Sequence, residues 1–155
     1  APMKIHRYGW PLDPAGNPYG GGGVQILPRD FLKIGQLMLD RGTWQGRRIL
    51  GRDFVTRASS PLYPLGKISY GYSWWGIDYP YGSRTVHAFF AGGRGGQVVM
   101  VIPDADLVVG IFGGNFHDGR VGLRIQQEYV PQYILPAVRE GGSPVSRPVT
   151  SKSRS

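Results

Sequence analysis

Residues 85–112, TVHAFFAGGRGGQVVMVIPDADLVVGIF, decide the fold of this chain. They contain three runs rich in β-branched and aromatic residues, separated by a glycine-rich stretch and by a turn of proline and aspartate. These runs predict strands at 85–91, 97–102 and 107–112, and the short connections predict an antiparallel meander. The segment from Pro103 to Asp106 is the clearest turn. The last two runs are apolar nearly throughout, which predicts strands covered on both faces.

A further strand is expected just upstream, at residues 70–78. Alternation along this strand would place Tyr70, Tyr72 and Trp74 on one face and Trp75 on the other. Packing within the sheet is the ordinary role of such aromatic residues, and the wall of a pocket is the alternative. Ser73, between them, is the only serine inside a strongly predicted element.

Helical spacing of apolar residues predicts helices on either side of the meander. The most regular pattern starts at Pro28, which suits a first helical position, and stops before Gly42. In the last helix, Pro131 and Pro136 should shorten or kink the chain. The expected helices cover residues 28–41, 52–58 and 121–138, with a short strand at 47–50. The predicted fold class is therefore α+β, an antiparallel sheet flanked by helices.

The two ends of the chain differ in composition from its centre. Residues 1–23 are rich in proline and glycine and predict an irregular connection without helix or strand. Residues 141–155 contain mostly serine, proline, threonine and basic side chains, which predicts a disordered basic tail. The 155 residues are enough for one domain with a real core, expected at 1–140.

Composition excludes several functional classes. Because the chain has no cysteine, thiol nucleophiles, iron–sulfur clusters and cysteine-based zinc sites are excluded. The three histidines show no spacing typical of metal ligands, so no metal is expected. The net charge of +8 is dispersed, and no basic stripe interleaved with aromatic residues predicts nucleic-acid binding. No apolar run approaches the ~20 residues of a membrane span.

The glycine-rich segment at residues 92–96 is the best candidate for chemistry. It lacks the pattern of a P-loop or a dinucleotide fingerprint, so no nucleotide cofactor is expected. Glycines beside a strand allow a substrate to lie against the backbone, and Arg94 offers positive charge to an anion. No S-x-x-K, Tyr-x-Asn or G-x-S-x-G motif supplies a nucleophile. Ser73 has no base near it in the sequence and is better explained as structural.

Several segments in the same order resemble the serine β-lactamase-related hydrolases. These segments are Gly21-Gly22-Gly23 before the helix PRDFLKIGQLML, then GTWQGRRIL, YGYSWW, GGRGGQ and VIPDADLVV. The resemblance covers about residues 8–135 and only the C-terminal half of the family. The family includes class C β-lactamases, penicillin-binding-protein-like peptidases, esterases and amide hydrolases. It implies the C-terminal part of a β-lactamase/transpeptidase-like fold.

The resemblance also implies roles for residues of this chain. The family's S-x-x-K and Tyr-x-Asn elements lie upstream of the matching region. Its Lys/His-x-Gly triplet, on a strand that lines the site, falls on Arg94, Gly95 and Gly96. Arg94 keeps the cation but not a titratable proton, which favours carboxylate binding over proton transfer. Gln97 would contribute its backbone N–H to the oxyanion hole, and Trp74 and Tyr72 would form part of the pocket wall.

The resemblance implies acylation and deacylation of an ester, amide or lactam, with this chain as the C-terminal part of the enzyme. The expected partners are a small-molecule or peptide substrate and the N-terminal half of the same fold, or a second copy of the chain. A periplasmic or secreted location is implied by the resemblance alone. Two alternatives are a non-catalytic module that binds an anionic ligand such as a cell-wall peptide, and binding to an acidic surface or nucleic acid through the basic tail.

Overall fold

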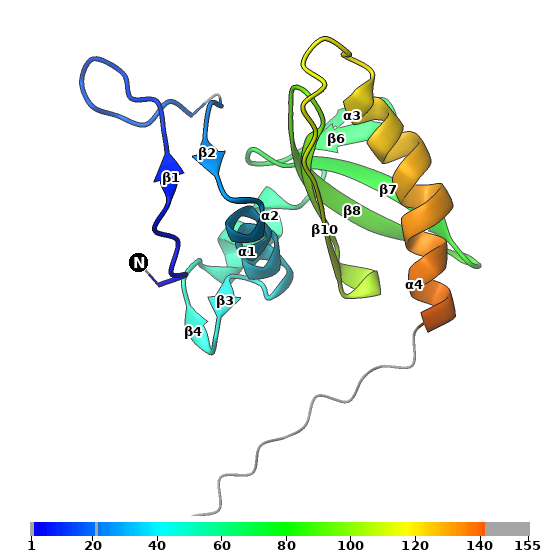
Figure 1. The fold of residues 1–155 in the computed structure, drawn as a ribbon. Coiled ribbons are helices and arrows are strands. Elements are labelled where there is room, and N and C mark those ends of the chain that lie inside the picture. The colour runs from blue at the N-terminus through cyan, green and yellow to red at the C-terminus, as the bar shows by residue number, and fades with distance from the viewer. Residues whose placement is uncertain (1, 21, 142–155) are drawn as a thin grey trace, which may run out of the picture.

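The centre of the molecule is a six-stranded antiparallel sheet, described by a computed structural model that covers residues 2–20 and 22–141 (Figure 1). Each strand pairs with its neighbour in sequence, so the predicted meander is confirmed. The strands, in spatial order, are β10 (Leu107–Ile111), β9 (Gln97–Ile102), β8 (Arg84–Gly93), β7 (Trp75–Tyr81), β6 (Ile68–Tyr70) and β5 (Tyr63–Leu65). A single 3₁₀ turn, η1 (Pro103–Ala105), joins β9 to β10, as the sequence of that turn predicts.

Helices cover the two faces of this sheet (Figure 1). On one face, α1 (Pro28–Leu39) and α2 (Arg52–Ala58) pack with Met38, Val55 and Phe89 in one apolar cluster. On the other face, the C-terminal helix packs on a larger cluster that includes Met100 and Ile125. The predicted α+β class, an antiparallel sheet flanked by helices, is therefore confirmed.

Burial differs between the two strands that the sequence predicts to be covered on both faces. From Val98 to Ile102, the side chains of β9 are at most 1% exposed, because β9 lies inside the sheet with helices on both faces. β10 is mostly half-buried, because it forms an edge of the sheet. The expectation holds for β9 and only in part for β10.

The first helix begins and ends where local chemistry predicts. Pro28 occupies the first turn, and the carboxylate of Asp30 pairs with the ammonium of Lys33 at 2.6 Å. Beyond the helix, the backbone N–H of Gly42 donates to the carbonyl oxygen of Leu37 at 2.8 Å with a φ of +85°. A glycine accepts this left-handed backbone without strain, so the chain turns away here. It continues into a hairpin of β3 (Thr43–Trp44) and β4 (Arg47–Arg48) and then into α2.

The N-terminal segment 1–23, which the sequence predicts to lack helix and strand, contains one short strand, and this strand pairs with a second one just after the segment. β1 (Tyr8–Gly9) pairs antiparallel with β2 (Gln25–Ile26). The loop between them is held by an isolated bridge between Leu12 and Pro18. In the same loop, the Asp13 carboxylate accepts hydrogen bonds from the backbone N–H groups of residues 15 and 17. Pairing of residues some 17 apart cannot be read from local composition, so the sequence missed it.

The strand predicted at residues 70–78 is interrupted, which corrects that prediction. β6 ends at Tyr70, and β7 begins at Trp75. Between them, the Gly71 N–H donates to the Trp74 carbonyl oxygen at 2.7 Å, and Ser73 has a φ of +62°. Only glycine fits at position 71 of this turn, because a Cβ atom there would collide with the carbonyl oxygen of Ala58 at the end of α2. Tyr72 and Trp74 therefore do not share a strand face with Tyr70, and Ser73 lies in a turn.

The C-terminal helix is longer than predicted. It runs without interruption from residue 121 to 141 as α3 (Val121–Arg124), the π-helical segment η2 (Ile125–Ile134) and α4 (Leu135–Gly141). Pro131 lies inside η2, where wider π-type turns accommodate a residue that lacks an N–H and crowds the preceding turn. The expected shortening at the two prolines is wrong. Apart from residue 141, the predicted tail at 141–155 lies outside the described residues.

Candidate functional site: the turn between β8 and β9

The residues that the sequence singles out for chemistry form the turn between β8 and β9. Arg94, Gly95 and Gly96 make the turn, and Gln97 is the first residue of β9, opposite Gly93 in the strand register. The φ angles of Gly95 and Gly96 are +93° and +92°, a conformation that glycine adopts readily. The triplet expected on a strand therefore lies in a turn, because two successive left-handed residues end the extended backbone of β8.

A second loop, residues 112–120, holds this turn in place. The Gly113 N–H donates to the Gly96 carbonyl at 3.2 Å, and the Asn115 N–H donates to the Gly95 carbonyl at 3.1 Å. In addition, Nε2 of Gln97 donates to the Gly113 carbonyl oxygen at 2.6 Å. Three hydrogen bonds thus join two loops that are about 18 residues apart in the chain.

Side chains pack closely against the same turn. A Cβ atom on Gly95 would lie 2.8 Å from the ring of Phe116, and one on Gly96 would collide with Val121. Both glycines are buried. The turn is therefore fixed by packing as well as by hydrogen bonds, and its two glycines are required by the space available.

Arg94 is the exception to this close packing. Its side chain is exposed, and within residues 2–20 and 22–141 it makes no hydrogen bond or ion pair. An arginine on a rigid turn, with its five donors free, is well suited to bind a carboxylate. Arg94 thus presents an unshared positive charge where two inner strands of the sheet, β8 and β9, are joined.

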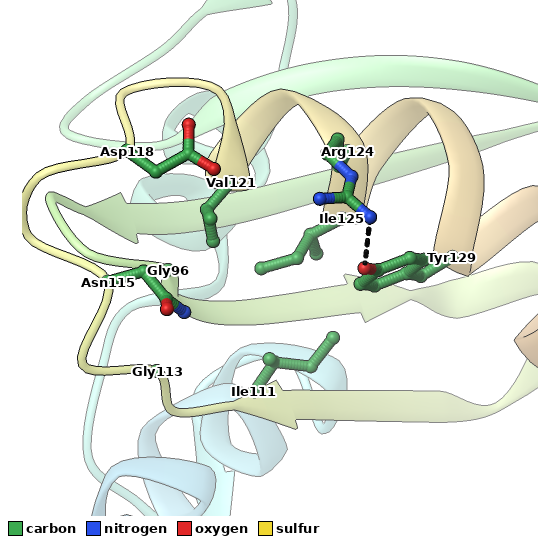
Figure 2. Close-up of a pocket in the computed structure, with 9 residues that line it drawn as sticks. All are labelled: Gly96, Ile111, Gly113, Asn115, Asp118, Val121, Arg124, Ile125 and Tyr129. Atoms are coloured by element: carbon green, nitrogen blue, oxygen red, sulfur yellow. Dashed lines mark hydrogen bonds between the residues drawn. The ribbon is translucent and has the colours of Figure 1, made fainter.

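Beside the turn lies an open cavity of about 310 Å³ (Figure 2). Its walls come from the ends of β9 and β10, the 112–120 loop and the first turns of the C-terminal helix. Apolar and polar groups contribute together: the lining residues are Gly96, Ile111, Gly113, Asn115, Asp118, Val121, Arg124, Ile125 and Tyr129. No sequence motif marks Asn115, Asp118, Arg124 or Tyr129, because they meet only after the helix packs on the sheet.

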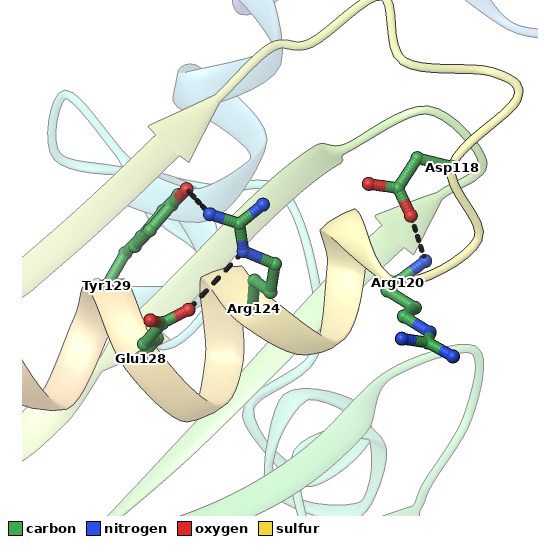
Figure 3. Close-up of polar contacts among 5 residues, drawn as sticks. All are labelled: Asp118, Arg120, Arg124, Glu128 and Tyr129. Atoms are coloured by element: carbon green, nitrogen blue, oxygen red, sulfur yellow. Dashed lines mark hydrogen bonds and ion pairs between the residues drawn. The ribbon is translucent and has the colours of Figure 1, made fainter.

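The charged groups near this cavity already have partners of their own (Figure 3). Arg124 contacts the Glu128 carboxylate at 3.4 Å and donates to the Tyr129 hydroxyl at 3.0 Å. Oδ1 of Asp118 accepts the backbone N–H of Arg120 at 2.9 Å. These contacts are exposed to solvent, so each is worth little in stability. Arg94 is the better candidate for binding an anion, since Arg124 shares its charge with Glu128.

The aromatic residues predicted for the pocket wall lie elsewhere. Trp74 packs edge-to-face on Phe89, with ring centroids 5.3 Å apart, on the α1–α2 face of the sheet. Tyr72 lies against Phe54 of α2, and the Arg57 guanidinium sits 5.6 Å from its ring centroid. Neither residue lines the cavity beside Gly96. The structure thus brings together Arg94, Gly95, Gly96 and Gln97 in one turn, and it does not place Tyr72 or Trp74 in the lining of the cavity beside that turn.

Two other features, a metal site and a membrane-spanning helix, are absent from the part of the chain that the structure describes. No group of three or more histidine, aspartate or glutamate side chains is arranged to hold a metal ion within residues 2–20 and 22–141. Over the same residues, no helix is both long and apolar enough to cross a membrane.

Comparisons with known proteins support the fold. No family profile and no curated protein matches the sequence. Among solved structures, the chain is similar to a "Putative 6-aminohexanoate-dimer hydrolase from Bacillus anthracis", with a TM-score of 0.64 and 21% identity. The alignment covers 84% of this chain but only 34% of that one. The shared fold is that of the β-lactamase-like hydrolases, so the chain corresponds to about a third of the similar structure.

Proposed function

We propose that this chain is the C-terminal part of a β-lactamase-related serine hydrolase, which acts by acylation and deacylation on an ester, amide or lactam. The fold shared with a β-lactamase-like hydrolase supports the class of enzyme. The upstream part would supply the serine and lysine, and this chain would supply an anchor for the substrate and a donor to the oxyanion.

The unpaired cation Arg94 on its immobilised turn carries this proposal. In our scheme the guanidinium binds a carboxylate of the substrate, while the backbone N–H of Gln97 points to the oxygen that becomes negative during acyl transfer. A donor held in place before the reaction stabilises that charge without reorganisation. The hydrogen bonds from Gly113, Asn115 and Gln97 supply the required rigidity.

The substrate class that fits best is an amide or ester that also bears a carboxylate. The name of the similar structure mentions a dimer of 6-aminohexanoate, and this compound is an amide that bears a carboxylate. Here, Arg94 would recognise the carboxylate, and the reacting carbonyl would lie at Gln97. We keep Trp74 and Tyr72 as proposed pocket residues. They would line a part of the site on the α1–α2 face, because neither of them lines the cavity beside Gly96.

The two edges of the sheet differ in a way that supports pairing with a strand from a partner. β5 is protected, because Pro64 at its centre has no N–H to offer a further strand. β10 has five apolar or glycine residues, no proline and no charge, and it is unpaired on its outer side within the described residues. We propose that a strand of the upstream part pairs with β10.

Two experiments test the proposal. The first reads the coding sequence upstream of Ala1 in the same frame, where we expect S-x-x-K followed by Tyr-x-Asn. A start codon or an unrelated domain there would overturn the catalytic assignment.

The second measures kcat and KM of the full-length protein for p-nitrophenyl acetate and for mono-p-nitrophenyl succinate, which adds a carboxylate. Arg94→Ala should raise KM for the succinate by about tenfold to a hundredfold, the value of one charge-assisted contact, and leave the acetate unchanged. Arg94→Lys should raise KM for the succinate by a smaller factor than Arg94→Ala. Arg47→Ala, at an exposed arginine of β4, is the matched control. Equal effects on both substrates would show that Arg94 is not a carboxylate anchor.

A further inference from the structure

His87, on β8, lies between two groups that can only accept hydrogen bonds. Its Nδ1 is 2.6 Å from a carboxylate oxygen of Asp78, its partner in the register between β7 and β8. Its Nε2 is 3.1 Å from the backbone carbonyl oxygen of Ser59, the residue that ends α2. One imidazole ring therefore joins the sheet to the end of a helix that packs on it.

The number of N–H donors on the ring decides how many of these two contacts can be hydrogen bonds. A neutral imidazole has one N–H, whereas the imidazolium has two. With one proton, either the Asp78 contact or the Ser59 contact would bring a nitrogen lone pair against an oxygen lone pair. Both contacts are hydrogen bonds only when His87 is protonated on both nitrogens.

The surroundings of the ring favour this arrangement. A Cβ atom on Gly76 of β7 would lie 2.9 Å from Cε1 of His87, so the ring packs over that glycine. The Ser59 carbonyl is at the C-terminus of α2, where the helix dipole favours a positive charge. Nε2 points at the Ser59 carbonyl oxygen, 3.1 Å away.

The charged and titratable groups on the neighbouring elements are few. From β7, Asp78 faces the ring, with its side chain 66% exposed and that of His87 36% exposed. From the last turn of α2, Arg57 is directed onto the ring of Tyr72. β6 contributes the neutral hydroxyl of Ser69 through its position beside Gly76. Asp78 is thus the charged group that the described structure places against His87.

We propose that His87 attaches the end of α2 to the sheet in a pH-dependent way. When the ring is doubly protonated, it holds the end of α2 to β7 and β8. When the ring loses a proton, the Ser59 contact becomes repulsive, and the end of α2 together with the 59–62 segment is released. Val55 and Ala58 of α2 belong to the apolar cluster with Phe89, so release also loosens that face of the sheet.

Thermal unfolding of the full chain between pH 5.5 and 8 tests this, because histidine is the side chain that changes charge in that range. At each pH, the Tm of His87→Gln is subtracted from the Tm of the wild-type protein. This difference should decrease by about 3 °C as the pH rises. In this proposal the contribution is present at low pH and lost at high pH, since both contacts are hydrogen bonds only with the doubly protonated ring. His117→Gln, at an exposed histidine, should keep the wild-type slope.

NMR provides a second test, and its ring-proton readout does not depend on a variant. At pH 6, both ring N–H protons of His87 should be protected from exchange with water, whereas those of exposed His117 should not. Amides of α2 should lose protection between pH 5.5 and 8 in the wild-type protein only. Parallel Tm curves for the wild type and His87→Gln, or only one protected ring proton, would overturn the proposal.

Discussion

The side-chain amide of Gln97 donates a hydrogen bond of 2.6 Å to the backbone carbonyl of Gly113. This single contact joins the start of β9 to the loop that leaves β10, and it lies next to the turn that carries Arg94. Any role of the Gln97 backbone in catalysis would therefore depend on how its side chain holds the turn. Gln97 has two functions in our scheme: its N–H is the proposed donor, and its side chain positions the turn.

Removing this amide should loosen the turn. We expect Gln97→Ala to lower the free energy of unfolding by about 1 kcal/mol, the usual value of one neutral hydrogen bond. Gln97→Glu should cost more at pH 7, because a carboxylate would face the Gly113 carbonyl, and should recover as the pH falls and the carboxyl regains a donor. Urea unfolding at pH 7 and pH 4.5 measures both. A Gln97→Glu variant as stable as wild type at pH 7 would contradict this role.

Two glycines in helices should respond in opposite ways to alanine. A Cβ atom on Gly35 of α1 would lie 2.6 Å from Val108 and 2.8 Å from Val99, so Gly35→Ala should destabilise by about 1–3 kcal/mol. Gly122 of α3 has open space around it, so Gly122→Ala should stabilise by about 0.5–1 kcal/mol. Chemical denaturation of both variants checks the pair. The same sign for both would show that α1 does not lie so close to β9 and β10.

The buried phenol of Tyr79 should make the folded state less stable at alkaline pH. Burial raises the pKa of its phenol well above the usual range, and the hydroxyl lies 3.9 Å from the sulfur of Met100. Because the unfolded chain ionises first, stability should fall above about pH 10, by about 1.4 kcal/mol per pH unit. Tyr79→Phe should remove this part of the loss and change stability at pH 7 by no more than about 1 kcal/mol. The free energies of unfolding of the wild type and Tyr79→Phe at pH 7 and pH 11 test this prediction. Tyr8→Phe, at an exposed tyrosine, is the control.

The 155-residue chain by itself should not turn over substrate. Ser73 lies in an exposed turn, and in the described part of the chain its side chain has no hydrogen-bond partner to activate it. We expect no hydrolysis of a chromogenic cephalosporin or of p-nitrophenyl acetate above a denatured control. Activity that Ser73→Ala abolishes would place the nucleophile in this chain and contradict our division of roles.

The unprotected edge of β10 predicts self-association of the isolated chain. Exposed apolar side chains add to this tendency, among them Tyr8, Leu12 and Tyr19, which are each at least 60% exposed. Light scattering should therefore show dimers or larger species that dissociate on dilution. A stable, monodisperse monomer would be strong evidence against a missing partner.

Much of the fold could be predicted from the sequence because it depends on local spacing. The strand at Gln97–Ile102 and the helix at Arg52–Ala58 have the predicted bounds. The candidate site could be predicted only in part. Arg94 and its glycines stand out in the sequence, but the loop at 112–120 that holds them carries no motif, because its hydrogen bonds to the turn are made by its backbone groups.

The errors have a common cause. Alternation of aromatic residues predicted one strand through Tyr72, yet the chain turns at Gly71, where only glycine fits against the end of α2. Two prolines predicted a shorter last helix, yet the helix widens around Pro131 and continues. In each case a long-range contact or a local change in helix geometry outweighed the intrinsic preference of the segment.

By itself, the sequence determined the meander, the helix that begins at Pro28 and the chemical character of the glycine-rich turn, since these follow from periodicity and from which residues tolerate a left-handed backbone. Only the tertiary structure decided that Gln97 meets Gly113 and that His87 meets both Asp78 and Ser59. These contacts join segments up to 28 residues apart. Which distant groups meet is set by how the sheet and its helices pack, and that packing is a property of the whole chain.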